Sequence, residues 1–138
     1  VEDDELSDSS PFPGWTSAFG IYIPAPDAAS APSLAFSGNI IEGVETGLRI
    51  EGYNATFAGD SIKGGDVGMQ LIDLPSLDAS NITIEGMLDY GIFASGTVGS
   101  VSASTFAGNG VGIYCQGGIL SSEGNTFTGN GVDVQGCE

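Results

Sequence analysis

Carboxylates are the side chains most able to do chemistry in this sequence, which holds 18 Asp and Glu, 2 Lys and Arg, and no His. Two carboxylates held about 5 to 9 Å apart can cleave a glycosidic bond. Asp60 with Asp66, and Asp73 with Asp78, are pairs that are close in the sequence, but solvated turn residues would show the same spacing. Without His, neither a Ser-His-Asp triad, a Cys-His pair nor a His-ligated zinc site can be built. We therefore expect no catalytic residues and no enzyme activity.

The same carboxylates could bind a divalent cation, because Ca²⁺ takes hard oxygen ligands from loops. Their spacing matches neither the EF-hand loop nor the Gly-Gly-x-Gly-x-Asp nonapeptide of calcium-binding β-rolls. We expect no cofactor and at most a diffuse or weak association of Ca²⁺. Whether a specific metal site exists stays open at the level of the sequence.

The charge balance restricts the possible partners. The chain has 138 residues and a formal net charge of -16, with Arg49 and Lys63 as its two cations. Two cations cannot neutralise the phosphates on which nucleic-acid affinity depends, and the negative field repels anionic membranes. Hydrophobic residues make up 41% of the chain, which is more than a disordered polyelectrolyte contains. The chain should therefore fold, and its length fits one domain.

An internal repeat of about 21 to 23 residues runs through the chain after residue 33. Residues 41–50 and 62–71 carry the same apolar and glycine positions 21 residues apart. The pattern continues in 84–93, 106–114 and 127–134. Each unit contains short apolar runs broken by Gly, Asn, Asp or Ser, which indicates short strands joined by turns, and no helical period is sustained.

Three short strands in a unit of this length can close one coil. Stacked coils then place equivalent residues above one another at the strand spacing of about 4.8 Å. Two interior columns are predicted on this basis: Ile41, Ile62, Ile84, Phe106 and Phe127, and beside them Leu48, Met69, Ile92, Ile113 and Val134. A ladder of glycines at positions 47, 68, 91 and 112 indicates either a bend with positive φ or a backbone approach too close for a side chain.

Two of these motifs carry a resemblance to a known family. Gly-Asn-Gly-Val-Gly-Ile (108–113) and Asn-Thr-Phe-Thr-Gly-Asn-Gly (125–131) resemble the repeats of right-handed parallel β-helix proteins, and the resemblance covers about residues 34–138. It implies an all-β, pectate-lyase-like parallel β-helix, a solenoid of about five coils. A leucine-rich repeat has a similar period, but its Leu-x-x-Leu-x-Leu ladder is missing. Pectate lyases, polygalacturonases, tailspikes, adhesins and surface-layer proteins share the fold, so fold alone does not indicate function.

Carbohydrate chemistry is the first function that the resemblance suggests. Pectate lyases use clustered Asp for calcium and an Arg base, and polygalacturonases use paired Asp with a Gly-His-Gly that this sequence lacks. Arg49 is flanked by Leu48 and Ile50, so Arg49 should point outward if those two residues point inward. We expect a surface Arg near Glu51 or opposite Gln70 one coil on. A carbohydrate-binding or polysaccharide-cleaving domain remains the alternative function.

Cys115 and Cys137 are 22 residues apart, so neighbouring coils would bring their Cα atoms within the usual disulfide range of about 4.4 to 6.8 Å. The alternative is a pair of buried free thiols in the column of Ile50 and Leu71. Glycosylation sequons begin at residues 54 and 81, which are Asn54 and Asn81. Together with a disulfide they favour an extracellular or cell-surface protein whose signal peptide has been removed.

The first 33 residues differ in composition from the rest. We expect an acidic tail over residues 1–8 and a Pro- and aromatic-rich cap or assembly segment up to residue 33, followed by β-helix repeats over 34–138. An uncovered edge at the last coil would pair with this segment of a neighbouring copy, giving a head-to-tail homo-polymer. The expected function is therefore a non-enzymatic structural subunit of a filament or surface layer. The side chains expected at the assembly contacts are Phe12, Trp15, Phe19, Ile21, Tyr22 and Ile23.

Overall fold

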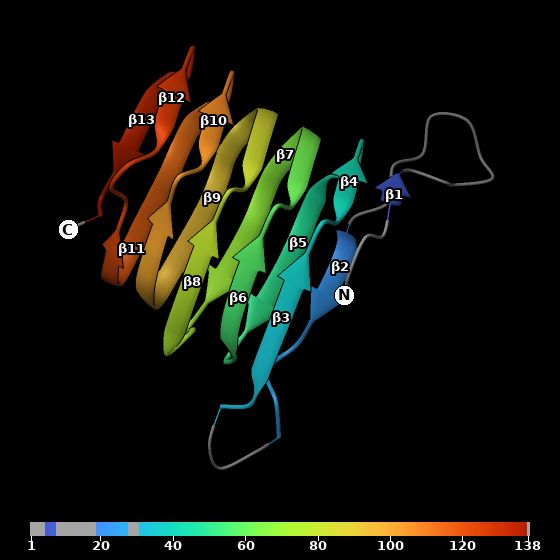
Figure 1. Ribbon diagram of the computed structural model, residues 1–138, viewed down its shortest axis with the longest axis vertical. Coiled ribbons are helices and arrows are strands. Elements are labelled where there is room, and N and C mark those ends of the chain that lie inside the picture. Colours follow the sequence, from blue (N-terminus) through green and yellow to red (C-terminus); the bar gives the residue numbers. More distant parts are fainter. Residues whose placement is uncertain (1–4, 8–18, 28–30, 138) are drawn as a thin grey trace.

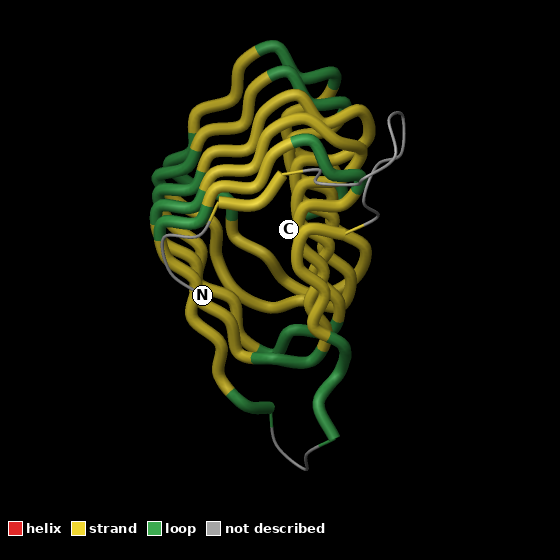
Figure 2. Tube along the Cα trace, turned by 90° about the vertical axis from the view of Figure 1, so that its right-hand side faces the viewer, coloured by secondary structure: helices red, strands yellow, loops and turns green. Residues whose placement is uncertain are grey.

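The computed structural model describes residues 5–7, 19–27 and 31–137. The regular secondary structure among these residues consists of β-strands. The chain winds into stacked coils around one interior (Figures 1 and 2). In chain order the strands are β1 (Glu5–Ser7), β2 (Phe19–Ile23), β3 (Ser33–Ser37), β4 (Ile40–Glu42), β5 (Thr46–Glu51), β6 (Asn54–Ala58), β7 (Ser61–Ile72), β8 (Ser76–Ser80), β9 (Thr83–Ser102), β10 (Thr105–Ala107), β11 (Val111–Ser121), β12 (Thr126–Thr128) and β13 (Val132–Gln135). The predicted all-β parallel solenoid of about five coils is confirmed.

The solenoid has three faces, on each of which parallel strands from successive coils lie side by side (Figure 1). The first face contains β3, β6, β8 and the final parts of β9 and β11. The second face contains β1, β4, the first parts of β7 and β9, and then β10 and β12. The third face contains β2, β5, the later part of β7, the middle of β9, β11 and β13.

Both predicted interior columns are present. Ile41, Ile62, Ile84, Phe106 and Phe127 are register partners on the second face, and Leu48, Met69, Ile92, Ile113 and Val134 are register partners on the third. The rings of Phe106 and Phe127 stack with their centroids 5.4 Å apart, and those of Phe36 and Phe57 stack at 4.8 Å. Each large apolar side chain buried in these columns stabilises the fold by about 1.5–3 kcal/mol.

The glycine ladder of the third face results from close backbone approach, and the alternative of positive φ is wrong at these four positions. A Cβ atom added at Gly68 would lie 2.5 Å from the carbonyl oxygen of Gly91 and 2.7 Å from Cγ2 of Ile84. The ladder has a further member that was not predicted from the sequence, Gly20, where a Cβ would lie 2.6 Å from the carbonyl oxygen of Gly47. Positive φ occurs instead at a corner glycine in five successive coils, at Gly43, Gly64, Gly86, Gly108 and Gly129.

The solenoid begins earlier than the boundary at residue 34 that the composition predicted. Strand β2 pairs with β5, so that Ile21 lies opposite Leu48, and β1 pairs with β4. Residues 5–7 thus belong to the sheet and not to a solvated tail. The reason is that parallel pairing uses backbone groups and needs no repeat in the side chains. Among the described residues no helix is long and apolar enough to cross a membrane.

Candidate functional site: an aromatic and polar strip on the third face

One column of side chains runs along the outside of the third face. In each strand it lies between two inward-facing residues, as Arg49 does between Leu48 and Ile50, both of which are buried. Parallel register then aligns the outward residues of successive coils. We call this column the outer strip, and its members are Tyr22, Arg49, Gln70, Phe93, Tyr114 and Gln135. Five steps at the strand spacing give it a length of about 24 Å.

The N-terminal half of the outer strip is polar and tightly connected. The Nη1 atom of Arg49 donates a hydrogen bond of 2.7 Å to Oε1 of Gln70, and its Nε lies 3.5 Å from Oε2 of Glu51. The hydroxyl of Tyr22 donates to the same Glu51 oxygen at 3.3 Å, and the guanidinium carbon lies 5.7 Å from the centre of the Tyr22 ring. An ion pair that is still partly open to solvent contributes little stability, so its main effect is to hold the guanidinium in place. The prediction that Arg49 faces outward near Glu51 and Gln70 is confirmed.

The C-terminal half of the outer strip is aromatic. Tyr114 stacks on Tyr90 with ring centroids 5.1 Å apart, and Phe93 lies 5.4 Å from each of them. All three rings are half-buried, so that part of each ring reaches solvent. This cluster was not predicted from the sequence. A signal was available, because Phe93 and Tyr114 directly follow Ile92 and Ile113 in the second interior column.

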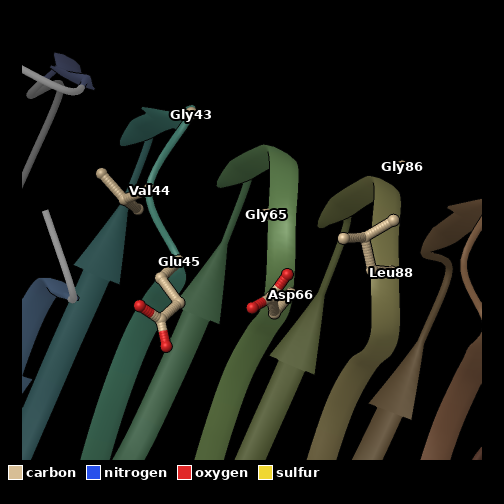
Figure 3. A pocket seen from close by; sticks show the side chains of 7 residues that line it. All are labelled: Gly43, Val44, Glu45, Gly65, Asp66, Gly86 and Leu88. Carbon is tan, nitrogen blue, oxygen red and sulfur yellow. The ribbon is translucent and has the colours of Figure 1, made fainter. Parts of the chain in front are cut away.

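A groove borders the third face at the corner that leads into its strands. It has a volume of about 450 Å³ and is lined by Gly43, Val44, Glu45, Gly65, Asp66, Gly86 and Leu88 (Figure 3). Glu45 and Asp66 come from neighbouring coils, and Leu88, from the next coil, is 75% exposed. The small corner residues leave the space open, and the residues that line it include two carboxylates and no cation.

The acid pairs singled out from the sequence are not assembled into a site. Asp60 is 5% exposed and packs inside the solenoid, whereas Asp66 lines the outer groove, so one ligand cannot contact both. Asp73 lies in a turn with a φ of 52°, and Asp78 is exposed on β8. Across the residues that the structure describes, no group of three or more Asp, Glu, Cys or His side chains could hold a metal ion.

The two cysteines form the predicted disulfide, with their Cα atoms 4.9 Å apart. Cys115 continues the column of Ile50, Leu71 and Ala94, as expected, whereas Cys137 lies two positions beyond Gln135, the register partner of Tyr114. The bond therefore ties the last described coil to the coil before it, and the alternative of two free thiols is wrong.

The two sequons lie in different surroundings. Asn81 is exposed at a corner with a φ of 53°. Asn54 is partly buried, and its Nδ2 donates a hydrogen bond of 3.1 Å to the carbonyl oxygen of Ala31. Glycosylation would use the side-chain nitrogen of Asn. At Asn54 this nitrogen is thus already hydrogen-bonded, whereas at Asn81 it belongs to an exposed turn residue.

The residues expected at assembly contacts differ in how far they are exposed. Tyr22 is exposed on the outer strip, whereas Ile21 and Ile23 are partly buried and pack against the core of their own chain, because their strand joins the sheet. Phe19 is the first residue of β2. The remaining two, Phe12 and Trp15, lie outside the described residues.

A comparison with protein families finds a match over most of the chain. The family model described as a right-handed β-helix region matches residues 16–137. The match begins near the start of β2, in agreement with the place of that strand in the sheet. No curated protein and no solved structure matches the chain.

Proposed function

We propose that this chain, which belongs to the right-handed β-helix family, is a non-enzymatic extracellular solenoid that binds a neutral glycan along the outer strip. The observation that carries the proposal is the cluster of Tyr90, Phe93 and Tyr114, whose rings lie 5.1–5.4 Å from one another on the outside of the sheet. Half-buried aromatic rings on a flat sheet offer a surface for a flat, partly apolar ligand.

A sugar ring matches the chemistry of both halves of the strip. One face of a pyranose carries C–H groups, which are attracted to the negative face of an aromatic ring. Its rim carries hydroxyl groups, which can exchange hydrogen bonds with the amides of Gln70 and Gln135. Because the outward side chains recur at the strand spacing of about 4.8 Å, a chain of sugars lying parallel to the solenoid axis would meet a new side chain at each coil.

The charge of the protein favours a neutral glycan over an acidic one. The net charge of -16 repels a polyanion at long range. Arg49, the cation of the strip, is already paired with Glu51, so its field is largely compensated. The proposal covers glycan binding and not glycan cleavage. The carboxylate of Glu51 is engaged by both Arg49 and Tyr22, and the outer strip has no second acid opposite it.

The experiment is a binding titration of the wild-type protein against a panel of neutral and acidic oligosaccharides, measured by calorimetry. The Phe93→Ala and Tyr114→Ala variants should each weaken binding of the best neutral ligand at least tenfold, since a stacking contact is removed. Ile119→Ala is the matched control, because Ile119 is an exposed apolar residue on the first face. An equal loss of affinity in all three variants would contradict the proposal, and so would a panel in which no neutral oligosaccharide binds. Turnover of a bound oligosaccharide would contradict the non-enzymatic part of the proposal.

A second candidate function, end-to-end assembly into a filament or surface layer, is favoured by the last described coil. Phe127 and Val134 belong to the interior columns but are partly exposed. Their register partners in the preceding coil, Phe106 and Ile113, are fully buried. Among the described residues, β12 pairs with β10 and β13 pairs with β11, and a strand at the edge of a sheet is a site for adding another strand.

The test of this second function is the solution state of the full chain by light scattering and negative-stain microscopy. Val134→Lys should abolish fibres, because it places a charge on the exposed end of the interior column. Gln135→Lys is the control, since that side chain points outward. A wild-type protein that stays monomeric at high concentration, whatever the salt, would refute assembly without affecting the glycan proposal.

A further inference from the structure

The glycine ladder of the third face ends, in the described chain, on a residue that has a side chain. The ladder contains glycines in successive coils, at Gly20, Gly47, Gly68, Gly91 and Gly112. A Cβ atom added at any of them would lie 2.5–2.7 Å from the carbonyl oxygen of the ladder residue in the next coil. In the last described coil the ladder position is Asp133, because its neighbours Val132 and Val134 are the register partners of Val111 and Ile113.

The side chain of Asp133 starts where the backbone of a further coil would have to lie. Asp133 does not have a positive φ, and its strand keeps register with β11. Its Cβ therefore takes the direction that an added Cβ would take at Gly112. There, that direction leads to the carbonyl oxygen of Asp133 at 2.5 Å and to Cδ1 of Phe127 at 3.1 Å, both in the following coil. A coil stacked on Asp133 in the same register would meet its Cβ with both its backbone and its interior column.

The carboxylate of Asp133 is a second obstacle to stacking. The residue is exposed, and its Oδ1 accepts a hydrogen bond of 3.2 Å from Nδ2 of Asn130. A further coil would enclose the carboxylate beside Phe127 and Val134, the partly exposed ends of the two interior columns. The charge would lose its hydration, which one hydrogen bond from an amide does not replace. Inward-pointing charged residues are one means by which natural sheets protect an exposed edge.

We propose that Asp133 closes the β13 edge of the solenoid to any further coil in the same register. Overpacking against backbone and burial of a charge act together at this position. Glycine at the same position of the earlier coils admits the next coil, so the ladder residue decides whether stacking continues. The inference does not depend on glycan binding, and it limits the second candidate function to end contacts that leave β13 unpaired.

The test adds one coil to the full chain. A second copy of residues 118–135 is fused directly after Glu138, which keeps the step of 21 residues that separates Asn109 from Asn130. The added residues then include copies of β12 and β13, and β13 itself stacks on the strand that contains Gly112. The same sequence is therefore placed over Asp133 instead of a glycine. Hydrogen exchange of the added amides, followed by mass spectrometry, measures whether this coil stacks.

With Asp133 in place, the amides of the added β13 copy should exchange as fast as those of an unfolded chain. Asp133→Gly should slow their exchange at least tenfold, because it removes both the Cβ atom and the charge. Asp133→Ala is the matched control, since it removes the charge and keeps the Cβ, and it should slow the exchange less than threefold. Equal protection with alanine and glycine would overturn the role given to the Cβ contact.

The extended chain with Asp133 decides the proposal whether or not the variants fold. Slow exchange of its added β13 copy would overturn the proposal, because a coil would then stack on Asp133. Fast exchange that persists after Asp133→Gly would also overturn it, provided that the urea midpoint shows the original coils to be folded. Loss of glycan binding would leave these measurements unaffected.

Discussion

Replacing Gly68 by Ala tests the reason for the glycine ladder. Gly68 lies on β7 at an ordinary, non-positive φ, so an alanine there meets no backbone strain of its own. Its Cβ would lie 2.5 Å from the carbonyl oxygen of Gly91 and 2.7 Å from Cγ2 of Ile84, both of which belong to the next coil. Neither atom can retreat easily, because the oxygen is part of a paired strand and Ile84 is fully buried.

The expected cost follows from these contacts. Overpacking a well-filled interior costs about 1–3 kcal/mol, and two simultaneous clashes, one of them with backbone, place Gly68→Ala at the upper end of that range. Alanine also restricts the unfolded chain, which offsets about 0.4–1 kcal/mol. We therefore expect a net loss of about 2 kcal/mol in the free energy of unfolding.

Gly108→Ala is the matched control. Gly108 has a φ of 65° and no atom within 4 Å of an added Cβ, so its substitution carries the cost of left-handed backbone, about 1–2 kcal/mol, without a clash. With the same offset in the unfolded chain, we expect a net loss of about 1 kcal/mol or less. Urea unfolding of both variants measures the difference. If Gly68→Ala were no more destabilising than Gly108→Ala, close approach would not be the reason for the ladder.

Three further predictions concern other contacts. Cys137→Ser should lower the free energy of unfolding by about 3 kcal/mol, the value for a loop of about this length in the chain-entropy model, and intact mass after alkylation without reductant should show no modified thiol in the wild type. Asn109→Leu should cost about 2 kcal/mol or more in urea unfolding, because it leaves the N–H of Met87 and the carbonyl of Ile84 without their partner; an unchanged midpoint would contradict this. When the protein is secreted from a eukaryotic cell, its mass should rise by a shift that a glycosidase removes. Asn81→Gln should abolish this shift and Asn54→Gln should not. The reverse pattern would show that exposure does not decide which sequon is used.

The aromatic cluster illustrates what the repeat leaves undetermined. Phe93 and Tyr114 occupy outward positions, where the equivalent residues of other coils are Arg49, Gln70 and Gln135. Nothing in the packing of a coil requires a particular side chain there. The residue types could be read from the sequence, but their meeting with Tyr90 depends on register between coils and on ring orientation.

Asp60 makes the same point inside the molecule. From the sequence it is one acid among turn residues, like Asp66 and Asp78. The structure buries it, because its corner carries a side chain that accepts from the backbone of the preceding coil. Local spacing cannot distinguish a corner residue that turns inward from one that turns outward.

For the disulfide, the sequence supplied the spacing of one coil, and the structure decided between the bond and two free thiols. The sequence by itself determined the period of the coil, the two interior columns and the outward direction of Arg49. These depend on an interior that must be apolar at a fixed position in each unit, so they leave a repeating pattern. Only the tertiary structure decided that β1 and β2 belong to the solenoid, that Asp60 is buried and that three aromatic rings meet on the third face. Backbone pairing does not depend on side-chain identity. Contacts between coils join residues that are more than 20 positions apart, and for β1 and β4 the separation is 35, so the local order of residues records neither.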